Sequence, residues 1–309
     1  MPGRTIEYAR LPTERPNPRS QALDCLSILQ ILRLMNREDA HVPRAIGRVL
    51  PQIAAAVNLI ASSLRSGHRL FFLGAGTSGR LGVIEAAECP PTFNTRPDQL
   101  QAIIAGGPRA VFRSQEGAED QRHAARAAIR RRVQAGDAVV GIAASGVTPF
   151  VAAGLRTAAQ RGASTMLITC HPETALRSTV DVLIAPSVGP EVITGSTRLK
   201  SGTATKLILN MLTVASMVQL GKVYGHTMVD VKPASRKLRA RALRIVQITA
   251  GVSEPRAAVA LRHAQGHVKQ AIVMAALRIP AAQARRLLQA SHGKLAPLLH
   301  ADIPTRSPG

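Results

Sequence analysis

The sequence predicts an α/β fold, a doubly wound parallel sheet of five strands covered by helices on both faces. Five short apolar runs alternate with longer stretches in which apolar residues recur at helical spacing. Strands joined by helical crossovers pair in parallel, and the handedness of the crossover places helices on both sides of the sheet. Ligands of such sheets bind at the carboxyl ends of the strands. The expected strands are residues 69–73, 100–105, 138–143, 164–169 and 181–185, and the helices between them are 78–88, 118–134, 148–161 and 173–178.

Composition and charge support a folded globule. The 309 residues are 46% hydrophobic but only 2% aromatic, which predicts an aliphatic, alanine-rich core. The formal charge of +22 would ordinarily suggest a nucleic-acid partner. However, the excess arginines are scattered through alanine-rich helices such as 121–133, with no aromatic residues between them for base stacking. We therefore expect no nucleic acid as the primary partner.

Cysteine usage and hydropathy exclude several classes of protein. Cys25, Cys89 and Cys170 are widely spaced and form no CxxC pair, so neither a disulfide framework nor a zinc site is expected. The N-terminus carries no apolar signal region, and no apolar run reaches the roughly 18 residues of a membrane span. These features predict a cytoplasmic protein with no membrane partner.

The part of the chain before the first strand is expected to be mostly helical. Residues 1–20 contain four prolines and several arginines and are interpreted as an exposed arm. Residues 20–66 carry apolar side chains at helical spacing, which predicts helices that pack on the following domain or on a second subunit.

The first strand leads into the turn on which the predicted binding site depends. Gly74, Gly76 and Gly79 interrupt the apolar pattern before it resumes, which is typical of a strand, a tight turn and a helix. Such a turn directs backbone N–H groups and the positive end of the helix dipole at one point. Thr77 and Ser78 add hydroxyl donors there. The expected occupant is a phosphate.

The same turn fits the G-x-G-x-x-G spacing, so a dinucleotide site is an alternative. That site needs a carboxylate at the end of the second strand to hold a ribose. Here Gly106, Gly107 and Pro108 follow the second strand, and the ribose ligand is missing. Two hydroxyl groups in the turn suit a phosphate monoester better than a pyrophosphate. A purely structural glycine turn is the other alternative.

A second turn of similar composition follows the third strand. Ser145, Gly146 and Thr148 lie in it, and Pro149 suits the first turn of the next helix. Taken alone, Ser145 and Thr148 are equally consistent with turn and cap residues. Because both turns lie at one edge of the sheet, a shared phosphate site is expected.

The last third of the chain is expected to be helical. Residues 189–210 should open a helix that runs to about Leu220, and a helical appendage with breaks at Gly251 and Pro280 follows. Pro304–Gly309 are expected to be disordered. The helix opening is dense in hydrogen-bond donors, namely Ser196, Thr197, Arg198, Lys200, Ser201 and Thr203.

Three domains result from this organisation: an N-terminal arm with helices (1–56), the sheet domain with its phosphate site (57–222) and the helical domain (223–309).

Two glutamates follow adjacent strands of the predicted sheet. Glu88 is expected to close the helix after the first turn, because Pro90 and Pro91 should force the chain out of it. Glu119 lies past the second strand at the start of another helix. Taken alone, each glutamate is interpreted as a surface or capping residue. Together, on loops beyond adjacent strands, they suit paired acid and base chemistry.

The motifs resemble one family along most of the chain. The runs GAGTSGRLG…AAECPPT, IAGG, EGAED, GIAASG.TP, VGPEVITGSTRLKSGTA.K and GK.YG..MVDV occur in this order. They are similar to those of the N-acetylmuramic acid 6-phosphate etherases, enzymes with the sugar-isomerase (SIS) fold. The likeness extends over about residues 12–300.

The resemblance implies a lyase that splits the lactyl ether of N-acetylmuramic acid 6-phosphate into N-acetylglucosamine 6-phosphate and D-lactate. It implies a homodimer and neither metal nor organic cofactor. Glu88 falls on the family's catalytic acid and Glu119 on its base. The phosphate ligands fall on Thr77, Ser78, Ser145 and Thr148, and possible further substrate residues are Gly76, Gly146, Glu191 and Lys200.

Three departures from the family pattern and two rival functions accompany the resemblance. Val147 and Phe150 replace an Arg and a Tyr, Glu85 replaces an Asp, and Ser235 replaces an Asn. A non-catalytic sugar-phosphate sensor would need the phosphate loop but not both glutamates. An aldose-ketose isomerase would need the base but no acid aimed at a leaving group on C3.

Overall fold

The computed structural model describes residues 11–231 and 235–299 and contains the predicted parallel sheet of five strands. The strand order is β2-β1-β3-β4-β5, so β1 has neighbours on both sides and the sheet extends in both directions from it. All four neighbouring pairs are parallel. The strands are β1 (Leu70–Gly74), β2 (Leu100–Ile104), β3 (Ala138–Ile142), β4 (Ser164–Ile168) and β5 (Val182–Ile184).

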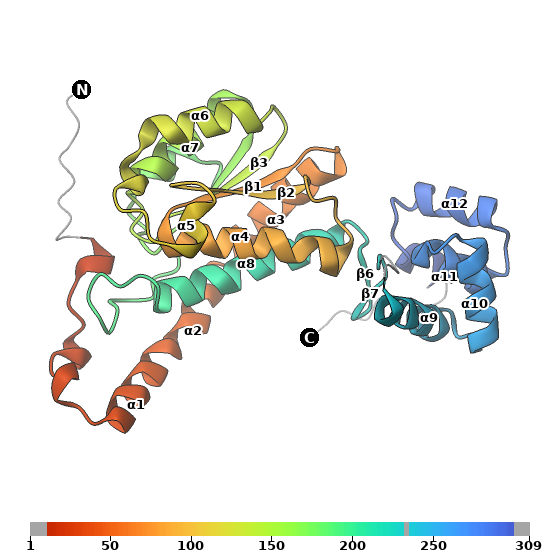
Figure 1. Ribbon diagram of the computed structural model, residues 1–309, viewed down its shortest axis with the longest axis horizontal. Coiled ribbons are helices and arrows are strands. Elements are labelled where there is room, and N and C mark those ends of the chain that lie inside the picture. Colours follow the sequence, from red (N-terminus) through yellow and green to blue (C-terminus); the bar gives the residue numbers. More distant parts are fainter. Residues whose placement is uncertain (1–10, 232–234, 300–309) are drawn as a thin grey trace. The chain divides into compact units, whose positions relative to one another are not determined.

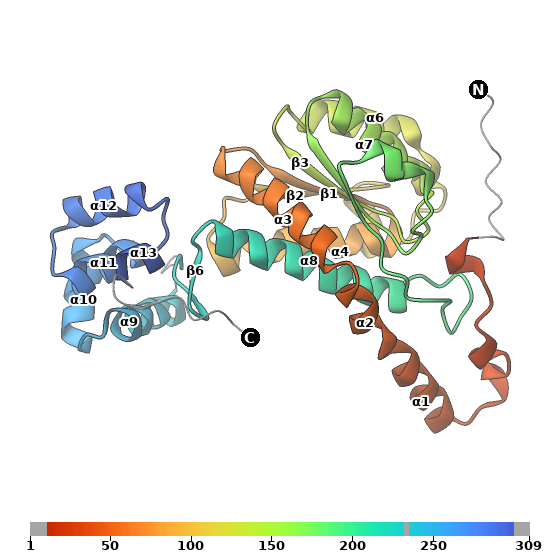
Figure 2. The ribbon, with the colours of Figure 1, turned by 180° about the vertical axis from the view of Figure 1, so that it is seen from behind.

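Helices cover both faces of this sheet, which confirms the predicted doubly wound α/β class. Helices α6 (Arg122–Arg132) and α7 (Pro149–Gln160) lie on one face (Figure 1). Helices α3 (Leu50–Arg65) and α4 (Gly76–Phe93) lie on the other, together with the first part of α8 (Lys200–Gln219), as Figure 2 shows from behind. Every residue of β1 and β3 is buried, as expected for central strands covered on both sides.

The core on the α6 and α7 face is mostly aliphatic, as the composition predicts. Phe71 and Leu73 of β1 pack with Val139 of β3, Ile129 of α6 and Leu155 of α7 in one buried cluster. Burial of these side chains is the main favourable free-energy term that holds the helices on the sheet.

The segment before the sheet is helical, but its first part is not a wholly exposed arm. Short 3-10 turns at Pro12–Glu14, Pro18–Ser20 and Leu23–Cys25 precede α1 (Ile28–Asp39), α2 (His41–Gly47) and α3. Leu11, Thr13 and Asn17 are buried, so the expectation of an exposed arm is wrong for these three residues, whereas Arg15, Pro16, Pro18 and Arg19 are exposed. The arm's first ten residues lie outside the described residues.

Two predicted helix boundaries are wrong. Helix α4 does not end at Glu88 but continues through Pro90 and Pro91 to Phe93. The prolines lie in the last turn, where each forfeits only one backbone bond, and the Asn94 amide still donates to the Pro90 carbonyl at 3.0 Å.

Helix α8 begins at Lys200, because the chain before it contains Pro190 and a left-handed Gly195 (φ +78°). Ser196, Thr197 and Arg198 therefore precede this helix rather than forming its first turns. The remaining short helices of the sheet domain are α5 (Arg109–Phe112), the 3-10 turn Ala118–Asp120 and the 3-10 turn Ala175–Thr179.

The chain divides into two compact units. The first comprises the described residues up to Glu88 and Pro97–Thr213, and the second comprises Cys89–Arg96 and the described residues from Val214 onward. The finer division at 56/57 and 222/223 stays a prediction.

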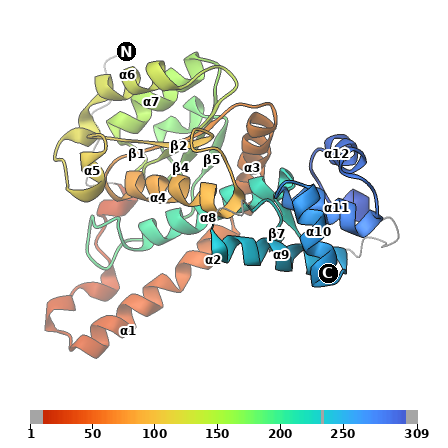
Figure 3. The ribbon, with the colours of Figure 1, turned by 45° about the vertical axis from the view of Figure 1, so that its right-hand side comes forward.

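The second unit has its own apolar core and is mainly helical (Figure 3). Gly251 ends its first helix in the left-handed conformation, and Pro280 precedes another helix, so both predicted breaks are present. The appendage is not wholly helical, because a two-stranded antiparallel hairpin precedes the helices. Pro304–Gly309 lie outside the described residues. Its elements are β6 (Val223–Tyr224), β7 (Thr227–Met228), α9 (Arg236–Ala250), α10 (Glu254–His263), α11 (Val268–Leu277), α12 (Ala281–Ala290) and α13 (Ala296–Leu299).

Within the described ranges, no single helix has the length and apolar character needed to cross a membrane; one bent pair, Ile28–Gly47 with Leu50–Arg65, meets that test together.

Candidate active site

The first predicted phosphate turn joins β1 to α4 with almost no space between them. A Cβ on Gly74 would lie 2.8 Å from the Gly79 amide nitrogen, and a Cβ on Gly79 would lie 2.7 Å from Ile104. Both positions therefore need glycine. This close approach places Thr77 and Ser78 in the first turn of α4, where unpaired N–H groups of the helix also point.

The second turn follows β3 and is held from behind by the segment after β4. Gly146 has φ +72°, and a Cβ there would lie 2.9 Å from Thr169 Oγ1, so only glycine fits. Thr174 Oγ1 donates to the Gly146 carbonyl at 2.5 Å, and His171 Nδ1 donates to the Ser145 carbonyl at 3.0 Å. These bonds fix the loop and give His171 a structural role.

Both turns open into one pocket. The carboxyl ends of β1, β2 and β3 are in register, with Gly74 opposite Ile104 and Ile142, so the loops that follow them meet. The pocket has a volume of about 300 Å³. Thr148 makes no side-chain capping bond although it precedes α7, so its hydroxyl is not used by the helix. The predicted residues that line the pocket are Gly76, Thr77, Ser78, Ser145, Thr148 and Glu119.

Glu119 lies on the 3-10 turn after the left-handed Gly117 (φ +72°) and is exposed at the wall formed by the segment after β2. It shares the pocket with the four hydroxyl residues of the two turns. The structure therefore brings together the predicted phosphate ligands and the predicted base.

Glu88 does not line this pocket. It lies ten residues after Ser78 on α4, which corresponds to about 15 Å along the helix axis. Its side chain is exposed, and Ile84, one turn earlier on the same helix, is 56% exposed. Of the two predicted catalytic carboxylates, only Glu119 lines this pocket within one chain.

Glu85 is one of the departures from the family pattern and lies on α4, one turn before Glu88. Its side chain is hydrogen-bonded to a neighbouring helix. Its carboxylate accepts a hydrogen bond from the Thr213 hydroxyl of α8. Burial raises the pKa of Glu85 above its usual value, and the Thr213 bond opposes that rise. Ser235, another departure, caps α9 by accepting from the Leu238 amide at 3.2 Å.

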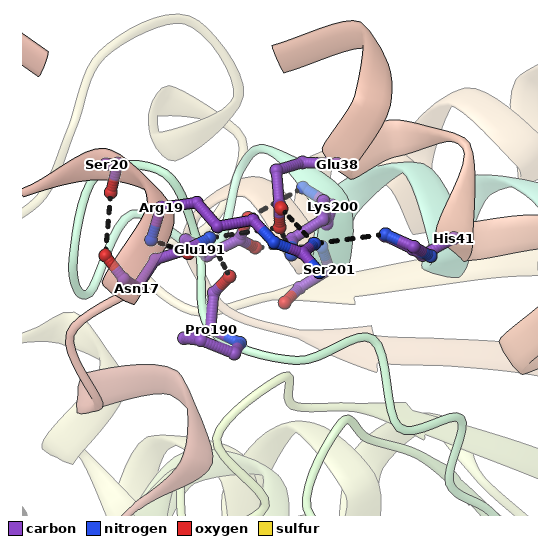
Figure 4. Close-up of polar contacts among 9 residues, drawn as sticks. All are labelled: Asn17, Arg19, Ser20, Glu38, His41, Pro190, Glu191, Lys200 and Ser201. Carbon is purple, nitrogen blue, oxygen red and sulfur yellow. Dashed lines mark hydrogen bonds and ion pairs between the residues drawn. The ribbon is translucent and has the colours of Figure 1, made fainter. Parts of the chain in front are cut away.

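Glu191 and Lys200 belong to a buried network beside the pocket rather than to its lining (Figure 4). Glu191 caps α8, since its two oxygens accept from the Lys200 and Ser201 amides at 2.9 Å each. Lys200 Nζ donates to Glu38 Oε2 at 2.6 Å, and Glu38 also accepts from Arg19 and Asn17. The network ties the N-terminal segment to the start of α8.

The Glu38 ion pair makes the stability of the protein depend on acid pH. Burial alone would raise the pKa of Glu38, but hydrogen bonds from Lys200, Arg19 and Asn17 outweigh it and lower the pKa to about 2. A depressed carboxylate pKa contributes stability that is present above the unfolded value near 4.5 and is lost as the pH falls toward 2.

We therefore expect Glu38→Gln to lower the free energy of unfolding by about 3 kcal/mol at pH 7, because Lys200 is left buried without its carboxylate. The variant should also lose part of the stability change between pH 4.5 and 2. Urea unfolding at several pH values measures both. Glu173→Gln, at an exposed site, is the control. Equal stability of Glu38→Gln and wild type at pH 7 would contradict this account.

The cysteines offer no nucleophile at the pocket. Cys89 and Cys170 are buried, and burial raises the pKa of Cys170 to about 11. Among the described residues, no group of three His, Cys, Asp or Glu side chains is arranged to hold a metal ion.

Several lining residues were not expected from the sequence. Glu14 comes from the segment interpreted as an exposed arm, and the Gly195 amide, which donates to the Thr13 carbonyl at 3.0 Å, places it at the pocket. Arg80 directly follows the first turn and belongs to the run GAGTSGRLG, so the sequence contained a signal for this residue. The full set of unexpected polar lining residues is Thr13, Glu14, Arg80, Ser114, Gln115, Glu116 and Thr197.

Comparisons with known proteins match the sheet domain to SIS-domain families. Residues 52–159 match the family described as the glucokinase regulatory protein N-terminal SIS domain, and residues 118–215 match the SIS domain. A phosphoheptose isomerase from Francisella tularensis superposes with a TM-score of 0.50 at 17% identity, over 62% of this chain and all of that one. This likeness supports the fold alone.

Relatives similar along nearly the whole chain carry one name. A protein from Symbiobacterium thermophilum is 52% identical over 87% of this chain and 89% of its own length. A protein from Salinibacter ruber is 49% identical over 96% of each chain. Both are named N-acetylmuramic acid 6-phosphate etherase.

Proposed function

Because the chain belongs to the family of N-acetylmuramic acid 6-phosphate etherases, carbon–oxygen lyases, we propose that it cleaves the lactyl ether of that sugar phosphate in the pocket at the ends of β1 and β3. The products are N-acetylglucosamine 6-phosphate and D-lactate. The observation that carries this assignment of the site is the meeting of both hydroxyl-rich turns and Glu119 in one cavity.

The phosphate subsite consists of the two turns. Hydroxyl groups of Thr77, Ser78, Ser145 and Thr148 surround the N-terminus of α4, where backbone N–H groups and the helix dipole favour an anion. Gly76 and Gly146 contribute through their backbone conformation, because both have a positive φ that glycine adopts without strain and that shapes the two turns. Binding energy from the phosphate, remote from the reacting carbons, holds the sugar in position.

Glu119 is the base of the proposed mechanism. In the open-chain sugar, the proton on C2 is acidic because it lies next to the aldehyde. The Glu119 carboxylate removes it, and the electron pair then expels the lactate oxygen from C3 to leave an unsaturated aldehyde. Water adds to C3 of that aldehyde, and a proton returns to C2. One carboxylate must be ionised and another acid must protonate the leaving oxygen.

Glu88 is the proposed acid, and we propose that it acts on the pocket of a second copy of the chain in a homodimer. The distance of about 15 Å along α4 separates it from the phosphate turn of its own chain, which exceeds the length of the sugar. Exposed apolar side chains near it support pairing: Ile84, one turn earlier on α4, is 56% exposed, and Met211 on α8 is 37% exposed.

Glu191 and Lys200 act on the site indirectly in this proposal. They fix the start of α8 and the N-terminal segment that carries Glu14.

The same proposal includes a cytoplasmic location and the absence of nucleic-acid and membrane partners. It also includes the division of the chain into three parts, 1–56, 57–222 and 223–309.

The direct test is to incubate the purified protein with N-acetylmuramic acid 6-phosphate and to measure D-lactate. We expect stoichiometric release of lactate with N-acetylglucosamine 6-phosphate. A sugar-phosphate sensor would bind the compound without releasing lactate, and an isomerase would act on an unsubstituted hexose phosphate. Either outcome would overturn the proposed function.

A further inference from the structure

The charges that line the pocket are unevenly distributed. Three carboxylates face it, those of Glu14, Glu116 and Glu119. Among the described residues that line the pocket, Arg80 is the only cation. The substrate of the proposed function carries two anionic groups, the 6-phosphate and the lactyl carboxylate, so an anion that enters beside three carboxylates requires a compensating charge.

Arg80 is held in place from one side only. Its Nε donates to the Val111 carbonyl of α5 at 2.9 Å, which directs the guanidinium toward the segment after β2 that also carries Glu119. Among the described residues, the Arg80 side chain makes no other hydrogen bond, and it forms no ion pair. The terminal N–H groups of the guanidinium fork are therefore available to a ligand.

The phosphate does not account for this arginine. Four hydroxyl groups and the N-terminus of α4 already supply donors for the phosphate oxygens at the two turns. Arg80 lies two residues further along α4 than Ser78 and is tied to α5 rather than to the second turn. The remaining anion of the substrate is the lactyl carboxylate, and a planar guanidinium fork matches a carboxylate with two parallel hydrogen bonds.

We propose that the Arg80 guanidinium binds the lactyl carboxylate and so distinguishes the ether substrate from other sugar phosphates. This inference rests on the proposed function. It also has a consequence for the rate, because the departing lactate oxygen develops negative charge close to its own carboxylate. A fixed cation there stabilises that charge more strongly in the transition state than in the bound substrate.

The test compares the substrate with the product, which has the phosphate but no lactyl group. We expect Arg80→Gln to lower kcat/KM for N-acetylmuramic acid 6-phosphate by about 10- to 100-fold. Affinity for N-acetylglucosamine 6-phosphate should change by less than about twofold, which also shows that the pocket is folded. Arg113→Gln removes a nearby exposed charge outside the pocket and should change neither value.

A second substrate isolates the carboxylate itself. The 3-O-methyl ether of N-acetylglucosamine 6-phosphate has the same scissile bond without the acid group, and Arg80→Gln should lower its cleavage by a much smaller factor than cleavage of the lactyl ether, because only the contact with the carboxylate is missing from this substrate. Equal losses on both ethers, or weaker binding of the phosphate product, would assign Arg80 to the phosphate or to the pocket wall and overturn the inference. If wild type releases no lactate at all, the proposed function fails first, independently of Arg80.

Discussion

Glu119→Gln should reduce the release of D-lactate from N-acetylmuramic acid 6-phosphate by more than about 1,000-fold, within the range that loss of a general base produces. Glutamine has nearly the same shape but cannot accept the C2 proton. The residue is exposed on a 3-10 turn and forms no ion pair with the other described residues, so the fold should not suffer. Steady-state kinetics with a coupled lactate assay measures the effect.

Binding of the phosphate product is the control for this variant. Affinity for N-acetylglucosamine 6-phosphate should remain within about twofold of wild type, because the two turns are untouched. Asp120→Asn, at the exposed neighbouring position outside the pocket lining, should keep wild-type turnover. If Glu119→Gln retains more than a tenth of the activity, Glu119 is not the base.

Heterodimers that combine Glu88→Gln in one chain with Glu119→Gln in the other should regain about half of the wild-type activity, although each variant alone is inactive. Glu88 lies about 15 Å along α4 from the phosphate turn of its own chain. If it serves the pocket of the partner, one of the two sites in the heterodimer keeps both carboxylates and the other keeps neither.

Co-expression with two affinity tags and sequential purification isolates these heterodimers. Parallel preparations of each single-variant homodimer, carried through the same steps, give the background. An inactive heterodimer would contradict the arrangement across two chains, since a site made within one chain would lack one carboxylate in every subunit. A monomer in solution would contradict it as well.

Much of the fold was predictable because its signals are local. Each strand is a short apolar run, and buried parallel strands need little else. The two phosphate turns were predictable from glycines whose missing side chains allow close backbone approach, as Gly74 and Gly146 show. In register, β1 and β3 bring these turns together, which follows from topology alone.

The rest of the site depends on contacts between distant parts of the chain. Pro90 and Pro91 suggested that Glu88 sits at a helix end near the pocket, but prolines in a last turn leave most of the backbone bonds intact, and α4 carries Glu88 away from the pocket. Glu14 reaches the pocket through the Thr13 and Gly195 pairing, and Lys200 turns to Glu38, 162 residues away. No local pattern encodes such pairings.

Exchange of the C2 proton with solvent deuterium tests most directly whether the phosphate turns place C2 of the sugar against Glu119. In deuterated water, wild type should give N-acetylglucosamine 6-phosphate with one deuterium at C2, as measured by mass spectrometry and NMR. Glu119→Gln should show neither exchange nor lactate, whereas Glu88→Gln should exchange the C2 proton without releasing lactate. Exchange by Glu119→Gln at the wild-type rate, or a product without deuterium at C2, would contradict the account.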